Sequence, residues 1–147
     1  MTDGKAEQIM HRYERLNRED GYVNLDEPGY VRMFGKWSKK SGYAKLANGT
    51  LQNIYWGDSL VNRLTLAKEA DVALFSMQKY NDSPDFFVSE NGSSNIKQVS
   101  KTNPFDNEYK IGKTELIEYV NANGKKLQGI LYYPDDFEPG KKYPMIT

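Results

Sequence analysis

The sequence predicts a mostly β protein of antiparallel strands, with a C-terminal β-hairpin and a short N-terminal helix. The spacing of the strands fits the blades of a β-propeller. Short apolar runs broken by turn residues every 8–12 positions are typical of antiparallel all-β structure, not of alternating βαβ units. Aromatic residues make up 13% of the chain, eleven of them tyrosine, and such residues favour half-buried strands. A chain of 147 residues suits one domain and buries roughly 70% of its unfolded surface.

The N-terminal segment, residues 1–20, contains the one pattern that favours a helix. Within 5–19, Ile9, Tyr13 and Leu16 recur at helical spacing with charged residues between them. We therefore expect a short helix, which needs a partner face for stability.

Residues 21–104 are predicted to form partial propeller blades, built from short apolar runs. The runs are 29–37, 42–46, 50–56, 62–67, 71–78, 85–90 and 95–100. Asn48-Gly49 and Asn91-Gly92 suit turns that require positive φ, which favours hairpins at both places. Strand–turn units of similar style over 40–80 and 80–100 fit the repetition of blades.

Residues 105–147 are predicted to form a linker and a hairpin. The segment 100–115 is polar and contains one proline. Two alternating stretches then flank a turn at Gly124, which predicts a hairpin over 115–134. A proline-rich connection and the start of a further apolar strand follow.

Composition excludes several classes of protein. Lys+Arg and Asp+Glu are both 20, so no net charge attracts nucleic acid or anionic lipid. The absence of cysteine excludes disulfides and thiolate sites. No apolar run approaches the ~18 residues of a membrane span. The N-terminus has no hydrophobic signal core, which leaves two compartments open: cytoplasmic, or periplasmic or secreted if an export signal was removed.

Residues that could support catalysis are few. A Ser–His–Asp site would have to use His11, the sole histidine, which we interpret as a helix-surface residue. One histidine is also too few for a catalytic zinc site. Residues 57–61, "GDSLV", begin like a nucleophile elbow, but Val61 replaces the second glycine, so Ser59 is interpreted as a turn residue.

The acidic stretches and asparagine motifs favour turns over sites. Residues 80–85 and 134–140 lack the spacing of a calcium loop, and their Asp and Asn side chains suit turns. Asn48-Gly49-Thr50 and Asn91-Gly92-Ser93 match the glycosylation pattern, but hairpin turns explain them equally. We therefore predict no catalytic residue, no cofactor and no metal ligand in this chain.

The second half of the chain resembles the prolyl oligopeptidase family of serine peptidases, which includes dipeptidyl peptidase IV and acylaminoacyl peptidase relatives. Ser83-Pro84-Asp85 with Phe86-Phe87-Val88 is similar to a strand of the family's last propeller blade. The segment from Val99 to Pro104 is similar to the turn that closes the propeller. The spaced positions of the hydrolase entry motif are Gly124, Gly129, Tyr132, Pro134, Phe137, Tyr143 and Pro144. One departure is Asn123, where the family often has aspartate.

The resemblance implies a fragment in which a propeller ends and an α/β-hydrolase domain begins. The family's catalytic serine, aspartate and histidine would all lie downstream, so the fragment alone should be inactive while its parent cleaves short peptides that the propeller admits by size. Nothing here matches the paired glutamates that hold a substrate amino terminus, and Glu7, Glu14 and Glu19 do not fill that role. The implied partner is the missing hydrolase domain.

An alternative function is an independent all-β module that binds protein or glycan through a tyrosine-rich surface. Such a module should have a closed core, whereas a fragment should show uncovered apolar faces. Unpaired strand edges recruit other chains, so the fragment hypothesis also predicts self-association, by strand pairing or exchange of the 115–134 hairpin.

Overall fold

The computed structural model describes residues 9–13 and 29–146, which divide into two compact units. One unit comprises residues 1–79 and 83–102, the other 80–82 and 103–147. Apart from the 3₁₀ turn η1 (Asp106–Glu108), every regular element in the described residues is a strand. No helix in this part of the chain is long and apolar enough to cross a membrane.

The first sheet contains four antiparallel strands in chain order: β1 (Ile9–Tyr13), β2 (Gly29–Gly35), β3 (Ser41–Ala47) and β4 (Thr50–Gly57). The predicted N-terminal helix is wrong where the structure describes it, because Ile9–Tyr13 pairs with β2 as a strand. Hydrogen bonds across a sheet outweigh a helical spacing of three apolar residues. The rest of the predicted helix lies outside the described residues.

The second sheet repeats this order with β5 (Leu60–Leu66), β6 (Val72–Lys79), β7 (Asp82–Glu90) and β8 (Lys97–Gln98). The mostly β, antiparallel prediction is confirmed. The turn predicted within the acidic stretch 80–85 is shorter than that stretch, because β7 already begins at Asp82. The two sheets remain open, and the described residues form neither a closed barrel nor a ring of blades.

Two asparagine–glycine turns have the predicted backbone conformation. Asn48 (φ 51°) and Gly49 (φ 70°) connect β3 to β4, and Asn91 (φ 55°) and Gly92 (φ 69°) follow β7. Asparagine and glycine tolerate this left-handed region better than other residues do. Local chemistry therefore determines where these strands reverse.

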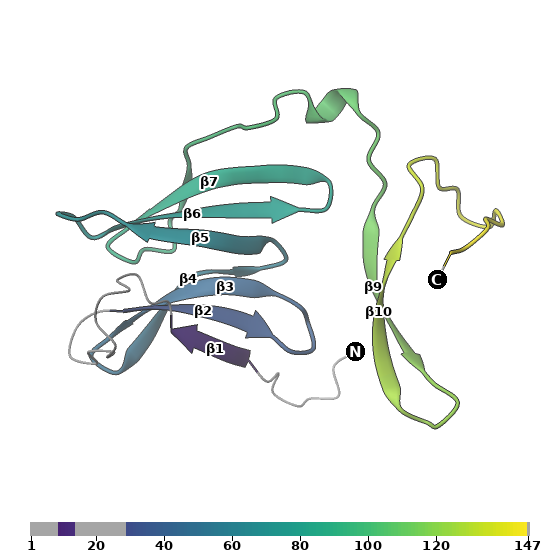
Figure 1. The fold of residues 1–147 in the computed structure, drawn as a ribbon, viewed down its shortest axis with the longest axis horizontal. Coiled ribbons are helices and arrows are strands. Elements are labelled where there is room, and N and C mark those ends of the chain that lie inside the picture. The colour runs from purple at the N-terminus through teal and green to yellow at the C-terminus, as the bar shows by residue number, and fades with distance from the viewer. Residues whose placement is uncertain (1–8, 14–28, 147) are drawn as a thin grey trace. The chain divides into compact units, whose positions relative to one another are not determined.

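The hydrophobic core of the first unit lies between its two sheets, which lie next to each other in Figure 1. The Phe75 ring packs edge-on against Tyr43 of the other sheet, with ring centroids 5.8 Å apart, and stacks on Phe87 at 6.4 Å. The buried members of this core are Tyr30, Tyr43, Ile54, Val61, Ala73, Phe75 and Met77. Residues from β2 to β6 thus share one core, which binds the sheets together.

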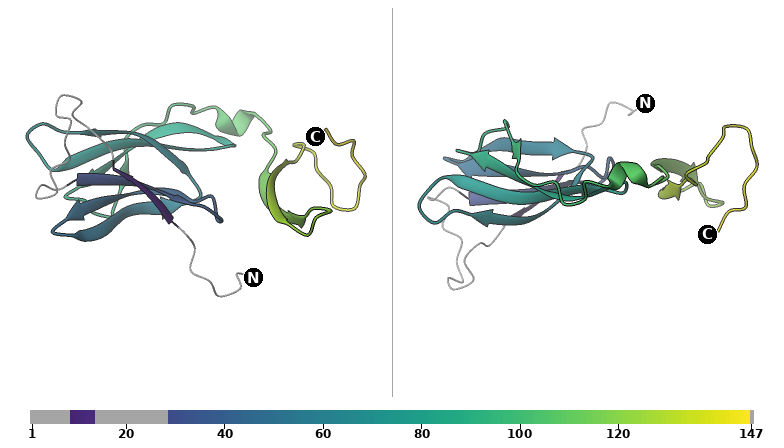
Figure 2. Two further views of the ribbon diagram at one scale, coloured as in Figure 1. Left: turned by 60° about the horizontal axis from the view of Figure 1, so that its bottom comes forward. Right: turned by 90° about the horizontal axis from the view of Figure 1, so that it is seen from above.

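The second unit contains a hairpin of β9 (Thr114–Val120) and β10 (Lys126–Tyr132), drawn as a twisted ribbon in Figures 1 and 2. Its register pairs Val120 with Lys126 and Thr114 with Tyr132 without a bulge. Gly124 takes positive φ (74°) in the turn, as the sequence predicts. The hairpin therefore forms where the sequence places it.

Candidate functional site

The two residues considered for a hydrolytic site belong to different parts of the first unit. His11 lies in β1 opposite Met33. Ser59 lies in the turn between β4 and β5 and is 8% exposed. Its backbone N–H donates to the Tyr55 hydroxyl at 3.2 Å, and its carbonyl accepts from the Ser41 hydroxyl at 2.8 Å. The backbone of Ser59 thus fixes this turn to the first sheet.

The acidic stretches form no metal site. Within residues 9–13 and 29–146, no group of three His, Cys, Asp or Glu side chains could hold an ion. In the first stretch, Asp85 is buried, whereas Asp82 is exposed at the start of β7. In the second, Tyr143 donates its hydroxyl to the Asp136 carbonyl at 3.1 Å and accepts from the Glu138 N–H at 3.0 Å. These contacts order the loop.

Asp85 accepts more of the hydrogen bonds given for the described residues than any other carboxylate does. One oxygen accepts from the Thr102 N–H at 2.8 Å and the Ser100 hydroxyl at 2.9 Å, and the other from the Gln98 amide at 2.9 Å. The Thr102 hydroxyl donates to the Pro84 carbonyl at 2.9 Å. The two segments that the resemblance singled out, 83–88 and 99–104, therefore meet at Asp85.

These hydrogen bonds also determine the direction in which the pKa of Asp85 shifts. The Thr102 N–H, helped by the Ser100, Thr102 and Gln98 side chains, lowers the pKa of the Asp85 carboxyl below its usual value, against the effect of burial. A carboxylate that already accepts from three donors is a poor general base, because its lone pairs are engaged. Asp85 closes the end of the second sheet, where β8 is only two residues long.

A second polar cluster connects the two sheets. The Tyr30 hydroxyl of β2 donates to Asp71 at 3.1 Å, and Lys45 of β3 forms an ion pair with the other oxygen of that carboxylate. The Asp71 carbonyl accepts from the Asn91 N–H at 2.7 Å. Burial, with the Asp71 charge and hydrogen bond, raises the pKa of Tyr30 to about 12, so the phenol stays neutral as a donor.

Sequence reasoning missed this cluster. Tyr30 and Asp71 lie 41 positions apart, and Lys45 and Asp71 lie 26 apart. No local pattern joins residues at such separations, and only the packing of the sheets brings them together.

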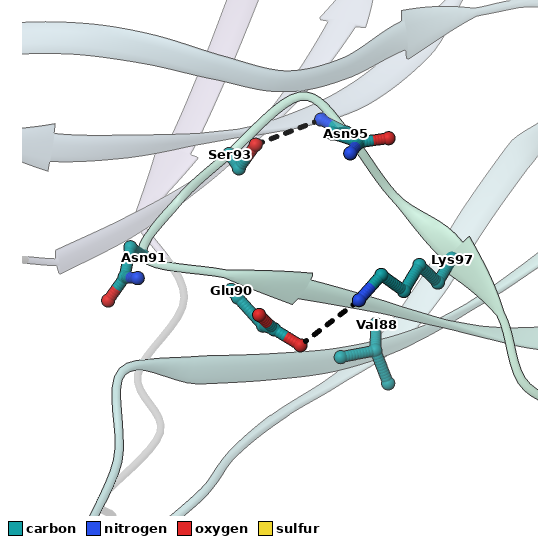
Figure 3. Close-up of a pocket in the computed structure, with 6 residues that line it drawn as sticks. All are labelled: Val88, Glu90, Asn91, Ser93, Asn95 and Lys97. Carbon is teal, nitrogen blue, oxygen red and sulfur yellow. Dashed lines mark hydrogen bonds and ion pairs between the residues drawn. The ribbon is translucent and has the colours of Figure 1, made fainter.

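A half-open pocket of about 270 Å³ lies beside the turn that follows β7. Figure 3 shows Glu90 and Lys97 joined across it as an ion pair, 3.6 Å between the charged atoms, and the Ser93 hydroxyl accepting from the Asn95 N–H at 3.0 Å. The two charges neutralise each other, and the small polar groups serve the turn. The lining contains no nucleophile paired with a base, so the pocket suits at most a small polar molecule.

The second unit presents apolar side chains on both faces of its hairpin. Leu116, Val120, Ile130 and Tyr132 lie on one face with exposed fractions from 38% to 61%. Ile117, Leu127 and Leu131 lie half-buried on the other. A two-stranded ribbon is marginal by itself, and a ribbon that is apolar on both faces is suited to lie between two layers.

An aromatic cluster orders the segment after the hairpin. Phe137 packs on Tyr133 at 4.5 Å between centroids and on Tyr143 at 5.6 Å, while the Lys113 ammonium lies 4.5 Å from the Tyr133 ring centre. The Tyr133 hydroxyl donates to Glu115 at 2.7 Å, which raises the pKa of Tyr133. Phe137 and Tyr143, two residues of the entry motif, are thus the residues that fold this segment back on itself.

Comparisons with known proteins reveal similarity in fold. No protein-family model matches the chain, and no curated protein matches it. Two solved structures of the AtxE2 isopeptidase are similar: the apo form, with a TM-score of 0.60, and a serine-to-alanine variant with Astexin3-dC4 bound, with a TM-score of 0.61. Each is 16% identical, and each match covers 81% of this chain. This chain spans 18% of the length of the isopeptidase chains.

Proposed function

We propose that the chain is a non-catalytic, architectural part of a serine peptidase of the prolyl oligopeptidase family. Residues 9–13 and 29–102 would supply two propeller blades, and 103–146 the linker and the first hairpin of the hydrolase domain. The parent would cleave short peptides, which the propeller admits by size. The fragment itself performs no chemistry in this proposal.

The observation that supports the proposal best is the repetition of one sheet topology. Two four-stranded antiparallel sheets follow each other in the chain, each with its strands in sequence order, and they pack face to face. Successive four-stranded sheets are the building unit of propellers. The hydrogen bonds that close the second sheet at Asp85 come from the segment in which the family closes its propeller.

The second unit supports the same proposal. Both faces of the β9–β10 hairpin carry exposed or half-buried apolar side chains, as expected of a sheet element that a larger domain covers. The name of the similar solved protein, an isopeptidase, supports a peptidase as the parent.

The first test is the sequence of the encoding gene beyond Thr147. We expect an open reading frame of about 200 or more further residues with a Gly-x-Ser-x-Gly elbow, then aspartate and histidine, because an α/β-hydrolase presents its triad in that order. A stop codon directly after Thr147 would overturn the proposal and favour the independent binding module.

The second test is activity of the chain itself. We expect neither hydrolysis of short peptide substrates nor labelling by a fluorophosphonate, since the carboxylate that accepts from the Ser100 hydroxyl, Asp85, already accepts two further hydrogen bonds and is a poor general base. Peptide hydrolysis that is lost in Ser59→Ala but kept in Ser38→Ala would contradict the assignment as a non-catalytic piece.

The binding-module alternative depends on a different feature. Exposed tyrosines of the second unit, Tyr109 at 68%, Tyr119 at 48% and Tyr132 at 58%, offer aromatic surface of the kind that recognition sites use. A glycan or peptide array that detects specific binding, lost in Tyr119→Ala, would favour this function.

A further inference from the structure

Asparagine followed by glycine occurs three times in the chain, as Asn48-Gly49, Asn91-Gly92 and Asn123-Gly124. Asparagine is a thermolabile residue, because the backbone nitrogen of the next residue can attack its side-chain amide carbon. Glycine has no side chain to obstruct that attack. The three pairs are therefore equivalent in local sequence, and any difference in their reactivity must come from the fold.

The Asn123-Gly124 pair is held by hydrogen bonds within its own turn. The Gly124 N–H, which carries the attacking nitrogen, donates to the Asn121 carbonyl at 2.9 Å. The side-chain oxygen of Asn121 accepts from the N–H groups of Asn123 at 3.0 Å and Lys125 at 2.9 Å. Reaction at Asn123 therefore requires this turn to open first.

The Asn91-Gly92 pair is held by packing against the rest of the first unit. The Asn91 N–H donates to the Asp71 carbonyl at 2.7 Å. Gly92 is buried, and a Cβ added to it would lie 2.7 Å from Cδ of Lys45. The Lys45 side chain thus covers Gly92 closely, so the backbone of this pair cannot rotate without displacing it.

The Asn48-Gly49 pair has neither restraint. Both residues are exposed, and so are the first four residues of β4. Space around Gly49 is open, and its N–H has no hydrogen-bond acceptor among the described residues. The pair of Ala47 with Thr50 closes the turn. Exposed elements with few contacts open locally at the lowest free energy, so the Asn48 amide can reach the Gly49 nitrogen most readily.

We propose that Asn48 is a site of spontaneous covalent modification, at which the folded chain deamidates before Asn91 or Asn123. The Gly49 nitrogen loses its proton to hydroxide and bonds to Cγ of Asn48. The bond from Cγ to Nδ2 breaks, and the amide leaves as ammonia, which leaves a five-membered succinimide. Water then opens the ring at either carbonyl to give aspartate or isoaspartate.

The reaction changes the turn between β3 and β4 in two ways. Either product adds one negative charge to a chain whose formal charge is zero. Isoaspartate also routes the backbone through the side-chain carbon, which adds an atom to a turn that fits two residues between paired strands. The inference does not depend on the proposed peptidase function.

Peptide mapping by mass spectrometry tests the proposal on the full chain at mildly alkaline pH, folded and in urea. In the folded chain, we expect Asn48 to convert about fivefold to tenfold faster than Asn91 or Asn123, the factor that one hydrogen bond contributes to a local equilibrium. In urea, the three rates should converge, because their local sequences are alike. Conversion of Asn91 or Asn123 as fast as that of Asn48 in the folded chain would overturn the proposal.

Two variants, checked for folding by circular dichroism, test the two physical causes. Gly49→Asn should slow conversion at Asn48, because a side chain then obstructs the attacking nitrogen while open space and a tolerated φ preserve the turn. Asn121→Ala removes the oxygen that orders the other turn, so it should speed conversion at Asn123 and leave Asn48 unchanged. An unchanged rate at Asn48 in the first variant, or at Asn123 in the second, would refute the corresponding cause.

Discussion

Phe75→Ala tests whether the two sheets of the first unit depend on one core. The Phe75 side chain is completely buried and lies between Tyr43 of the facing sheet and Phe87 of its own. Removing a buried phenylalanine ring costs about 3–5 kcal/mol of unfolding free energy, from lost transfer energy and the cavity left behind. Since domains of this size are stable by roughly 5–15 kcal/mol, the variant should retain its fold with much of its stability lost.

Urea unfolding at pH 7, followed by circular dichroism, measures this loss. A loss of about 4 kcal/mol divided by a urea dependence of about 2 kcal/mol per molar lowers the midpoint by about 2 M. Phe105→Ala is the control, because Phe105 is 57% exposed, and its effect should stay within about 0.5 kcal/mol. A Phe75→Ala loss below 1 kcal/mol, comparable to the control, would refute the shared core.

A double-mutant cycle separates the contact between the sheets from burial alone. Tyr43→Leu and Phe75→Leu keep an apolar side chain at each position but remove the edge-on ring pair. We expect a coupling free energy of about 0.5–1.5 kcal/mol between the two substitutions. Additivity within about 0.3 kcal/mol would show that the rings do not interact across the sheets.

Three further predictions concern backbone fit and ionisation. Gly42→Ala should lower stability by about 1–3 kcal/mol, because its Cβ would lie 2.0 Å from the Tyr55 carbonyl oxygen, whereas Gly49→Asn, with open space and a tolerated φ, should change the urea midpoint little. Asp85→Asn should destabilise the chain at pH 7. Because the folded pKa of Asp85 is lowered, the Asp85 carboxylate contributes stability above its unfolded pKa of about 4. This contribution is lost as pH falls through the folded pKa. The unfolding midpoint of Asp85→Asn should therefore fall less in acid than that of the wild type. Tyr30→Phe should lose less stability than the wild type between pH 10 and 12. With its folded pKa raised to about 12, the Tyr30 phenol contributes stability below pH 10, and this contribution disappears through that interval. Parallel pH profiles of wild type and either ionisation variant would contradict the corresponding prediction.

The strands were predictable where local pattern and turn chemistry agree. The run at 29–37 became β2, the run at 50–56 became β4, and the hairpin around Gly124 formed in place. In each case apolar residues are bounded by glycine or asparagine, whose backbone freedom marks the reversal. Such signals act over a few residues, and here the tertiary packing agrees with them.

Local pattern failed where a partner strand decided the outcome. Ile9 and Tyr13 have helical spacing, yet residues 9–13 pair with β2, because a neighbouring strand satisfies their backbone groups. β8 is shorter than the apolar run at 95–100 suggests. There the side chains of Gln98 and Ser100 bond Asp85, and these bonds take the place of a longer ladder.

The β class, the sites of chain reversal and the hairpin can be read from the amino-acid sequence, because they follow from side-chain alternation and from the φ preferences of Asn and Gly. Three features arise only from packing: the two sheets share a core around Phe75, Asp71 joins them through Tyr30 and Lys45, and Asp85 closes the second sheet. These features depend on contacts between residues far apart in the chain, which no local pattern encodes and which form only once the apolar faces have been buried together.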